Sequence, residues 1–170
     1  ISNYIGYFED SFLISKAKRY DVKGKRYINS PLKYYFEDIG LRNARLNFRQ
    51  TEESHVMENI IYNELKLRGY NVDVGIVEVY ETDKKGKRTL KKYEVDFIAT
   101  QGDNKYYIQS ALEMNNEEKA KQERKSLVNI NDSFKKIIVV KDDVKPRKDD
   151  NGITTIGIFN FLLEENSLDL

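Results

Sequence analysis

Residues 52–68 carry the clearest helical pattern in the chain. Apolar side chains recur there every three or four residues, at Val56, Met57, Ile60, Ile61 and Leu65. This spacing gathers them on one face of a helix. Gly69 follows at once, and glycine commonly ends a helix because it accepts a positive φ. The pattern therefore predicts a helix over residues 52–68 with one buried face.

Strand patterns follow this helix. Three stretches rich in β-branched and aromatic residues are separated by turn sequences at 83–86 and 102–104. They are residues 72–80, 90–99 and 105–111. A charged helix, an apolar strand of the buried parallel kind, another strand and a terminal helix are predicted at 116–130, 136–140, 153–157 and 158–163. The order αβββαβ, followed by βα, predicts an α/β (α+β) fold with a mixed sheet between helices.

The first fifty residues follow a different pattern. Helical and extended stretches alternate there, at residues 4–12, 12–19, 26–28, 33–36 and 41–46. A turn around Gly24 joins two of the extended stretches into a ribbon. A helix, a basic β-ribbon and a short helix together resemble the back half of a winged helix. We therefore expect a partial winged-helix-like unit at 1–50 and a second domain at 51–170. Because the chain starts with Ile1, we also expect a fragment of a longer protein.

The amino-acid composition excludes several kinds of functional site. The 170 residues are 39% hydrophobic and 34% charged, and twelve tyrosines and eight phenylalanines supply part of the core. The absence of cysteine excludes a disulfide framework, a thiolate zinc site and a cysteine nucleophile, and fits a cytoplasmic protein. His55 is the only histidine, which excludes a histidine-cluster metal site. No apolar run approaches the ~20 residues that span a bilayer, so we expect no membrane partner.

The net charge of +1 hides a basic ribbon in the first unit. Between residues 16 and 33 the only acid is Asp21, whereas seven residues are basic: Lys16, Lys18, Arg19, Lys23, Lys25, Arg26 and Lys33. Such runs are usually solvated surface. Clustering on a ribbon favours the alternative, a surface that contacts nucleic-acid phosphates through the first six of these residues.

A carboxylate layout in the second unit is the strongest chemical signal. Glu58 lies on the predicted helix and Asp96 on the second predicted strand. Gln109 and Ala111 lie two positions apart on the third strand, and so on one face. A helix Glu, a strand Asp and Glu-x-Lys on the next strand form the layout of PD-(D/E)XK nucleases, whose acids hold Mg²⁺ and whose lysine assists the attacking water. Here Gln109 supplies a neutral oxygen and Ala111 supplies nothing.

Each of these residues also has an interpretation without chemistry. Asp96 fits a hydrogen-bonded structural acid, and Glu58 fits the polar surface of an acid-rich helix. Gln109 fits a buried amide whose hydrogen bonds are satisfied within the fold. His55 shares the helical face of Glu58, where a surface role is the alternative to a ligand role.

Five segments together are very similar to one family, in the right order and across essentially the whole chain. They are residues 20–25 (YDVKGK), 33–44 (KYYFEDIGLRNA), 58–65 (ENIIYNEL), 93–97 (YEVDF) and 107–111 (YIQSA). The chain resembles the C-terminal domain of unknown function that follows the ATPase core in prokaryotic AAA-type ATP-binding proteins. This resemblance implies an upstream winged-helix start and an ATPase core, where ATP would bind. It also implies a restriction-endonuclease-like domain, commonly degenerate, in which Glu58, Asp96 and Gln109 occupy the nuclease positions.

We therefore expect a nucleic-acid-binding or assembly module with an inactive nuclease-like site. Glu58 and Asp96 would hold Mg²⁺ weakly at most, and the expected partners are DNA and the ATPase core of the parent chain. The first alternative is an active Mg²⁺-dependent DNA endonuclease in which Lys121 or Lys125 replaces the missing lysine. The second is a protein-interaction module, which the twelve tyrosines suit. Metal-dependent cleavage and salt-dependent DNA binding distinguish the three.

Overall fold

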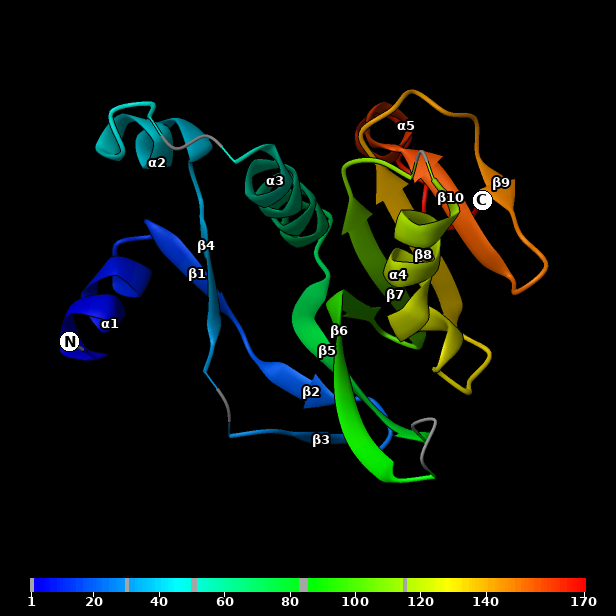
Figure 1. Ribbon diagram of the computed structural model, residues 1–170. Helices are drawn as coiled ribbons and strands as arrows, with labels where there is room; N and C mark the ends of the chain where they lie inside the picture. Colours follow the sequence, from blue (N-terminus) through cyan, green and yellow to red (C-terminus); the bar gives the residue numbers. More distant parts are fainter. Residues whose placement is uncertain (1, 30, 50–51, 83–85, 115) are drawn as a thin grey trace.

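An eight-stranded mixed sheet forms the centre of the molecule, in a computed structural model that describes residues 2–29, 31–49, 52–82, 86–114 and 116–170 (Figure 1). The strands lie in the order β3-β2-β5-β6-β7-β8-β10-β9. The long central strands are β5 (Asn71–Thr82), β6 (Arg88–Gln101) and β7 (Asn104–Ala111). The shorter strands are β2 (Arg19–Asp21), β3 (Arg26–Tyr27), β8 (Lys135–Val140), β9 (Arg147–Lys148) and β10 (Ile153–Gly157). The predicted mixed α/β class is confirmed.

Neighbouring strands of the sheet pair in two ways. β6 runs antiparallel to both β5 and β7, whereas β8 is parallel to both β7 and β10. A parallel pair needs a crossover, which α4 (Glu117–Val128) supplies between β7 and β8. Helix α3 (Glu53–Leu67) precedes β5, and α5 (Ile158–Leu163) follows β10. The elements from α3 to β8 therefore follow the αβββαβ order expected from the sequence.

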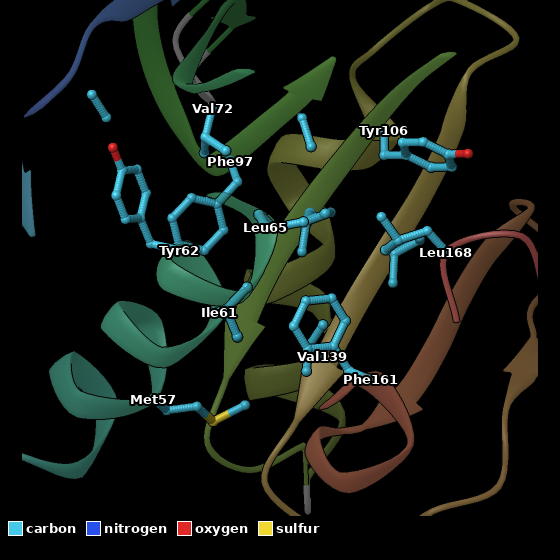
Figure 2. Packing of buried hydrophobic residues seen from close by; sticks show 14 of the residues in the cluster. Met57, Ile61, Tyr62, Leu65, Val72, Phe97, Tyr106, Val139, Phe161 and Leu168 are labelled. Carbon is cyan, nitrogen blue, oxygen red and sulfur yellow. The ribbon is translucent and has the colours of Figure 1, made fainter. Parts of the chain in front are cut away.

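Helices cover both faces of the sheet because strand side chains alternate between two hydrophobic clusters. The first cluster contains Leu65 of α3, Phe97 of β6 and Phe161 of α5, all with no exposed surface (Figure 2). The second contains Leu127 of α4, packed with Ile138 of β8. Fully burying one such side chain contributes about 1.5–3 kcal/mol. These clusters therefore hold the helices on the sheet.

Helix α3 ends with a residue in the left-handed conformation. Gly69 after α3 has φ 84°, and the next N–H, that of Tyr70, donates to the Leu65 carbonyl at 3.1 Å. This confirms the predicted helix end. Phe12 adopts the same left-handed conformation after α1 (Ser2–Asp10), with φ 54°. Its conformation explains why the strand expected from residue 12 begins only at Ile14.

Two helices and two strands from the first fifty residues lie at one end of the molecule, away from α4 and α5 (Figure 1). β1 (Ile14–Ala17) pairs antiparallel with β4 (Lys33–Phe36) in a separate two-stranded sheet. The short helix α2 (Ile39–Arg45) follows β4, and the Asp38 side chain caps it by accepting the Leu41 N–H. We call α1, β1, β4 and α2, together with the residues between α1 and β1, the N-terminal region.

The predicted boundary between residues 50 and 51 lies outside the described residues, but contacts on either side join the two predicted units. β2 pairs in parallel with β5 and so belongs to the main sheet. Tyr35 of β4 stacks on Tyr62 of α3, with ring centroids 4.0 Å apart, inside the first cluster. The Asn59 amide of α3 accepts the Phe36 N–H and donates to the Phe36 carbonyl, as a neighbouring strand would. The units share one sheet and one core.

The predicted turn at 83–86 lies outside the described residues apart from Gly86. The two-residue edge strand β9 is not predicted by the sequence pattern. In the part of the chain that the structure describes, no helix is long and apolar enough to cross a membrane.

Candidate functional site

Glu58 and Lys33 form the centre of a charged cluster between the two predicted units. Glu58 projects from α3, and Lys33 is the first residue of β4. Lys33 Nζ lies 2.6 Å from Glu58 Oε1 and 3.0 Å from Glu94 Oε1 of β6. Tyr35, two residues along β4, donates its hydroxyl to Glu58 Oε1 at 2.6 Å. One lysine thus pairs with carboxylates from α3 and from β6.

Arg19 of β2 completes this cluster. Its guanidinium forms an ion pair with Glu94, and its Nε donates to the Pro31 carbonyl at 2.9 Å. The side chains are largely withdrawn from solvent, and Glu58 is only 14% exposed. The five residues that fasten β2 and β4 to α3 and β6 are named the clasp: Arg19, Lys33, Tyr35, Glu58 and Glu94.

A β-bulge brings Asp96 next to the clasp. In the pairing of β5 with β6, Val74 alone faces two residues, Asp96 and Phe97. An extra residue of this kind breaks the regular alternation of side chains, and bulges are frequent beside functional sites. The Asp96 carboxylate accepts the Ser110 N–H through Oδ2 at 2.8 Å, where β6 and β7 separate. The bulge is therefore what directs this acid out of the regular strand pattern.

Burial and neighbouring charges set the protonation of the cluster. Burial, and then the Glu58 carboxylate, raise the pKa of Asp96 to about 7, against the opposing effects of a backbone N–H and of Lys33. Burial alone would lower the pKa of Lys33, but the Glu58 carboxylate more than compensates and raises it. The pKa of Glu94 is lowered because, against burial, Lys33 and Arg19 favour its charged form. The two cations thus come close to balancing the acids near neutral pH.

Gln109 does not contact Glu58. Its Nε2 donates to Glu123 of α4 at 3.3 Å, and its Oε1 accepts the backbone N–H of Asp96 at 3.4 Å. These contacts match the interpretation as an amide satisfied within the fold. Ala111 is 3% exposed and belongs to the second hydrophobic cluster, so the position of the nuclease lysine is packed in the core. The structure thus places Glu58 and Asp96 in one cluster, whereas the side-chain amide of Gln109 contacts helix α4.

The two lysines expected to replace the missing one lie elsewhere, which corrects that expectation. Lys121 is 3.7 Å from Glu117 on the exposed side of α4. Lys125 Nζ is 2.7 Å from Glu81 Oε1 and 4.7 Å from the centre of the Tyr93 ring. The reason is that α4 packs on the second cluster, whereas Glu58 belongs to α3 on the first.

The lysine at the acids is Lys33, which sequence reasoning counted only within the basic ribbon. It lies 25 residues before Glu58 and in the other predicted unit, so no motif spacing connects it with the acids. The segment that contains it, KYYFEDIGLRNA, is one of those that carry the family resemblance. The family resemblance therefore draws attention to this segment, but it does not indicate that Lys33 contacts the acids.

The basic ribbon is divided in the structure. Arg19 and Lys33 belong to the clasp, and Lys16 pairs with Glu9 at 3.0 Å. The other predicted phosphate contacts lie on or beside the β2–β3 hairpin: Lys18, Lys23, Lys25 and Arg26. Asp21 lies among them, with Oδ2 at 3.9 Å from Arg26 Nε. Four of the six predicted residues therefore remain together on one exposed hairpin.

The acids do not fit a magnesium ion as they are arranged. Among the described residues, no three His, Cys, Asp or Glu side chains are grouped so that they could hold a metal ion. The Lys33 ammonium lies between Glu58 and Glu94, where a cation would be needed. Hard divalent cations require the same carboxylate oxygens, so Mg²⁺ would have to displace this lysine.

Comparisons with known proteins give relatives without an assigned function. No protein-family model matches the chain, and no solved structure matches it significantly. An uncharacterized protein of Haemophilus influenzae is 35% identical over 164 residues, which are 96% of this chain and 37% of that protein. An uncharacterized protein of Methanocaldococcus jannaschii is 34% identical over 122 residues, 72% of this chain and 24% of that protein. The chain therefore spans much less than half the length of the curated relatives it matches.

Proposed function

We propose that this chain is a non-catalytic binding or assembly module of a larger ATP-dependent protein, built on a restriction-endonuclease-like fold. The order α3-β5-β6-β7-α4-β8, with β8 parallel to β7, is the one expected for that fold. The sequence resemblance to the domain that follows an AAA-type ATPase core supports the ATP-dependent parent. The chain also spans only 37% of the Haemophilus influenzae relative, which leaves room in that protein for an ATPase core.

The observation that carries the proposal is the ion pairing of Lys33 with Glu58 and Glu94. A nuclease with this layout needs acids that are free to ligate Mg²⁺ and a lysine beside the last acid. Here the Lys33 ammonium group already pairs with two carboxylates. Gln109 offers only a neutral oxygen, and Ala111 lies in the core. Positioned acid–base assistance is typically worth ~10²–10⁴-fold in rate, and position 111 has no lysine to supply it. In this proposal the acids stabilise the fold, and the site does not activate a water molecule for attack.

Supercoiled plasmid incubated with the chain and Mg²⁺ tests the proposal. We expect no nicking above the level given by an Asp96→Asn variant, because the amide keeps the hydrogen bond from Ser110 and removes only the charge. Efficient Mg²⁺-dependent cleavage that Asp96→Asn abolishes would overturn the non-catalytic assignment.

One observation favours a second function, a Mg²⁺-dependent DNA endonuclease. Lys33 Nζ stands 2.6 Å from Glu58 and favours the charged form of Asp96, so a lysine is available at the acids although it comes from β4. In this alternative a metal ion would displace the ammonium group, which would then orient the attacking water. Lys33→Met would abolish cleavage, whereas Lys125→Met, with its side chain at Glu81, would leave cleavage unchanged. Cleavage that survives Lys33→Met would exclude this alternative.

The target bound by the module is proposed to be DNA, contacted through the β2–β3 hairpin. Lys18, Lys23, Lys25 and Arg26 gather there, and the Arg26 side chain is 79% exposed. Cations on an exposed hairpin suit contact with phosphates and carry no sequence information. A titration of labelled duplex by fluorescence anisotropy measures this binding, and an affinity that does not depend on salt would favour a protein target.

A further inference from the structure

The N-terminal region contains an apolar groove with a volume of about 580 Å³. Side chains from α1, β1, β4 and α2 line it, together with Leu13 between α1 and β1: Ile5, Phe8, Leu13, Ile14, Phe36 and Leu41. Arg45 of α2 also lines the groove and is the one guanidinium among these residues. An apolar depression with a charge at its margin is the usual shape of a site that receives an amphipathic helix.

Helix α1 exposes apolar side chains beside this groove. Tyr4 is 69% exposed and Tyr7 is 63% exposed, and the two rings pack edge to face with centroids 6.2 Å apart. Phe8, which lines the groove, is itself 48% exposed. Aromatic residues gathered on one exposed face commonly mark an interaction surface. Helix α1 thus forms one wall of the groove, and its exposed aromatic side chains are of the kind that pack into an apolar groove.

Charge complements this apolar match. Asp10 is exposed at the end of α1, and Arg45 is exposed at the groove. Among the described residues neither forms a direct ion pair. Glu9 on α1 pairs with Lys16 at 3.0 Å, and Asp10 has only a weaker effect on that lysine, whose pKa it helps to raise. An acid on the helix and a base at the groove are the complementary pair that contact between two copies requires.

We infer that the groove receives helix α1 of a second copy of this chain. In a twofold dimer the contact is isologous, so each copy offers both α1 and the groove. Tyr4, Tyr7 and Phe8 of one copy pack into the groove of the other, and Asp10 meets Arg45 twice. This surface is separate from the clasp and from the β2–β3 hairpin. The inference goes beyond the proposed function and does not depend on it.

Sedimentation of the whole chain over a range of micromolar concentrations tests the inference, together with two charge reversals. Asp10→Arg and Arg45→Asp each set like charges against each other in a homodimer. We expect each to weaken dimerisation by about tenfold or more, because twofold symmetry counts each change twice. An equimolar mixture of the two variants should dimerise again, because each helix α1 then meets a groove of the opposite charge in its partner. Since both side chains are exposed, neither change should unfold the chain.

Matched variants separate this surface from others. Replacing Tyr4 and Tyr7 together by serine should abolish the dimer, whereas Leu67→Ser, at an 82%-exposed leucine on α3, should leave it intact. A wild-type chain that stays monomeric would overturn the inference and assign the groove to another protein or to a different segment of the parent polypeptide. A dimer that both charge reversals leave unchanged, or a mixture that fails to regain affinity, would equally overturn it.

Discussion

Aromatic residues behave differently in the sheet with α3 and in the N-terminal region. Tyr62 and Phe97 have at most 2% of their surface exposed, whereas Tyr4, Tyr7 and Phe12 are 63–82% exposed. Helix α3 covers an eight-stranded sheet, whereas α1 lies beside the short strand β1, and α2 lies beside β4 and one side of α3. Two strands offer too little surface to bury both helices. The comparison teaches that the N-terminal region leaves apolar side chains exposed, and two of them, Tyr4 and Tyr7, belong to the dimer contact that we propose.

Charged residues differ between the same two settings. In the clasp, Lys33 and Arg19 are withdrawn from solvent and paired with acids. On the β2–β3 hairpin, Arg26 remains 79% exposed and 3.9 Å from its acid. Partly buried pairs are little screened by salt, whereas exposed pairs contribute little to stability. The basic segment at residues 16–33 therefore contributes partly buried ion pairs to the clasp and exposed cations to the β2–β3 hairpin.

Truncation of buried and exposed apolar residues should show the largest difference. Leu65→Ala removes a fully buried side chain of α3 and should lower the free energy of unfolding by about 2–5 kcal/mol. Phe12→Ala, at an 82%-exposed ring, should change it by less than about 0.5 kcal/mol. Urea unfolding followed by circular dichroism measures both. Similar losses for the two variants would mean that the N-terminal region is packed as tightly as the sheet.

The pH dependence of stability should isolate Asp96. Its pKa in the folded chain is raised to about 7, so the folded state holds a proton that the unfolded state releases near pH 4. The stabilisation from this group is complete below about pH 4 and is lost as pH rises to about 7, on the order of 4 kcal/mol in all. Asp96→Asn should therefore gain stability relative to wild type between pH 5 and about 8. A difference that stays constant with pH would contradict the burial of this acid.

Local patterns predicted the elements well, and their assembly less well. The apolar stripe around Leu65 and the glycine at position 69 define α3, because both act within one or two turns of the helix. The parallel pairing of β2 with β5 joins residues more than fifty positions apart and leaves no periodicity to detect. The bulge at Asp96 depends on the register with a neighbouring strand, which one sequence does not specify.

The candidate site was predicted in part for the same reason. Glu58 and Asp96 were found because their places on a helix and a strand follow the nuclease layout, and they do share one cluster. Gln109 was found as a position, but its amide turns to Glu123 because α4 packs on that side. Lys33 was missed as a site residue, since its approach to Glu58 depends on how β4 docks on α3.

Reversing the hairpin charges should have the smallest effect on folding. Lys23→Glu, Lys25→Glu and Arg26→Glu together should change the free energy of unfolding by less than about 1 kcal/mol. They should weaken DNA binding to any sequence and flatten the plot of log affinity against log salt by about 0.9 for each phosphate that is no longer neutralised. The matched control reverses Lys119 and Lys121 of α4. Equal affinities for wild type and the hairpin variant would leave these residues as solvated surface only.

The pairing of Lys33 with Glu58 is the central claim, and a double-mutant cycle of the free energy of unfolding tests it most directly. Lys33→Met and Glu58→Gln keep the shapes of the side chains and remove the charges. We predict a coupling energy of about 1–3 kcal/mol, because both groups are largely buried and 2.6 Å apart. The exposed pair of Lys121 with Glu117, treated in the same way, should give less than about 0.5 kcal/mol. A coupling near zero for Lys33 and Glu58 would contradict the account of the clasp.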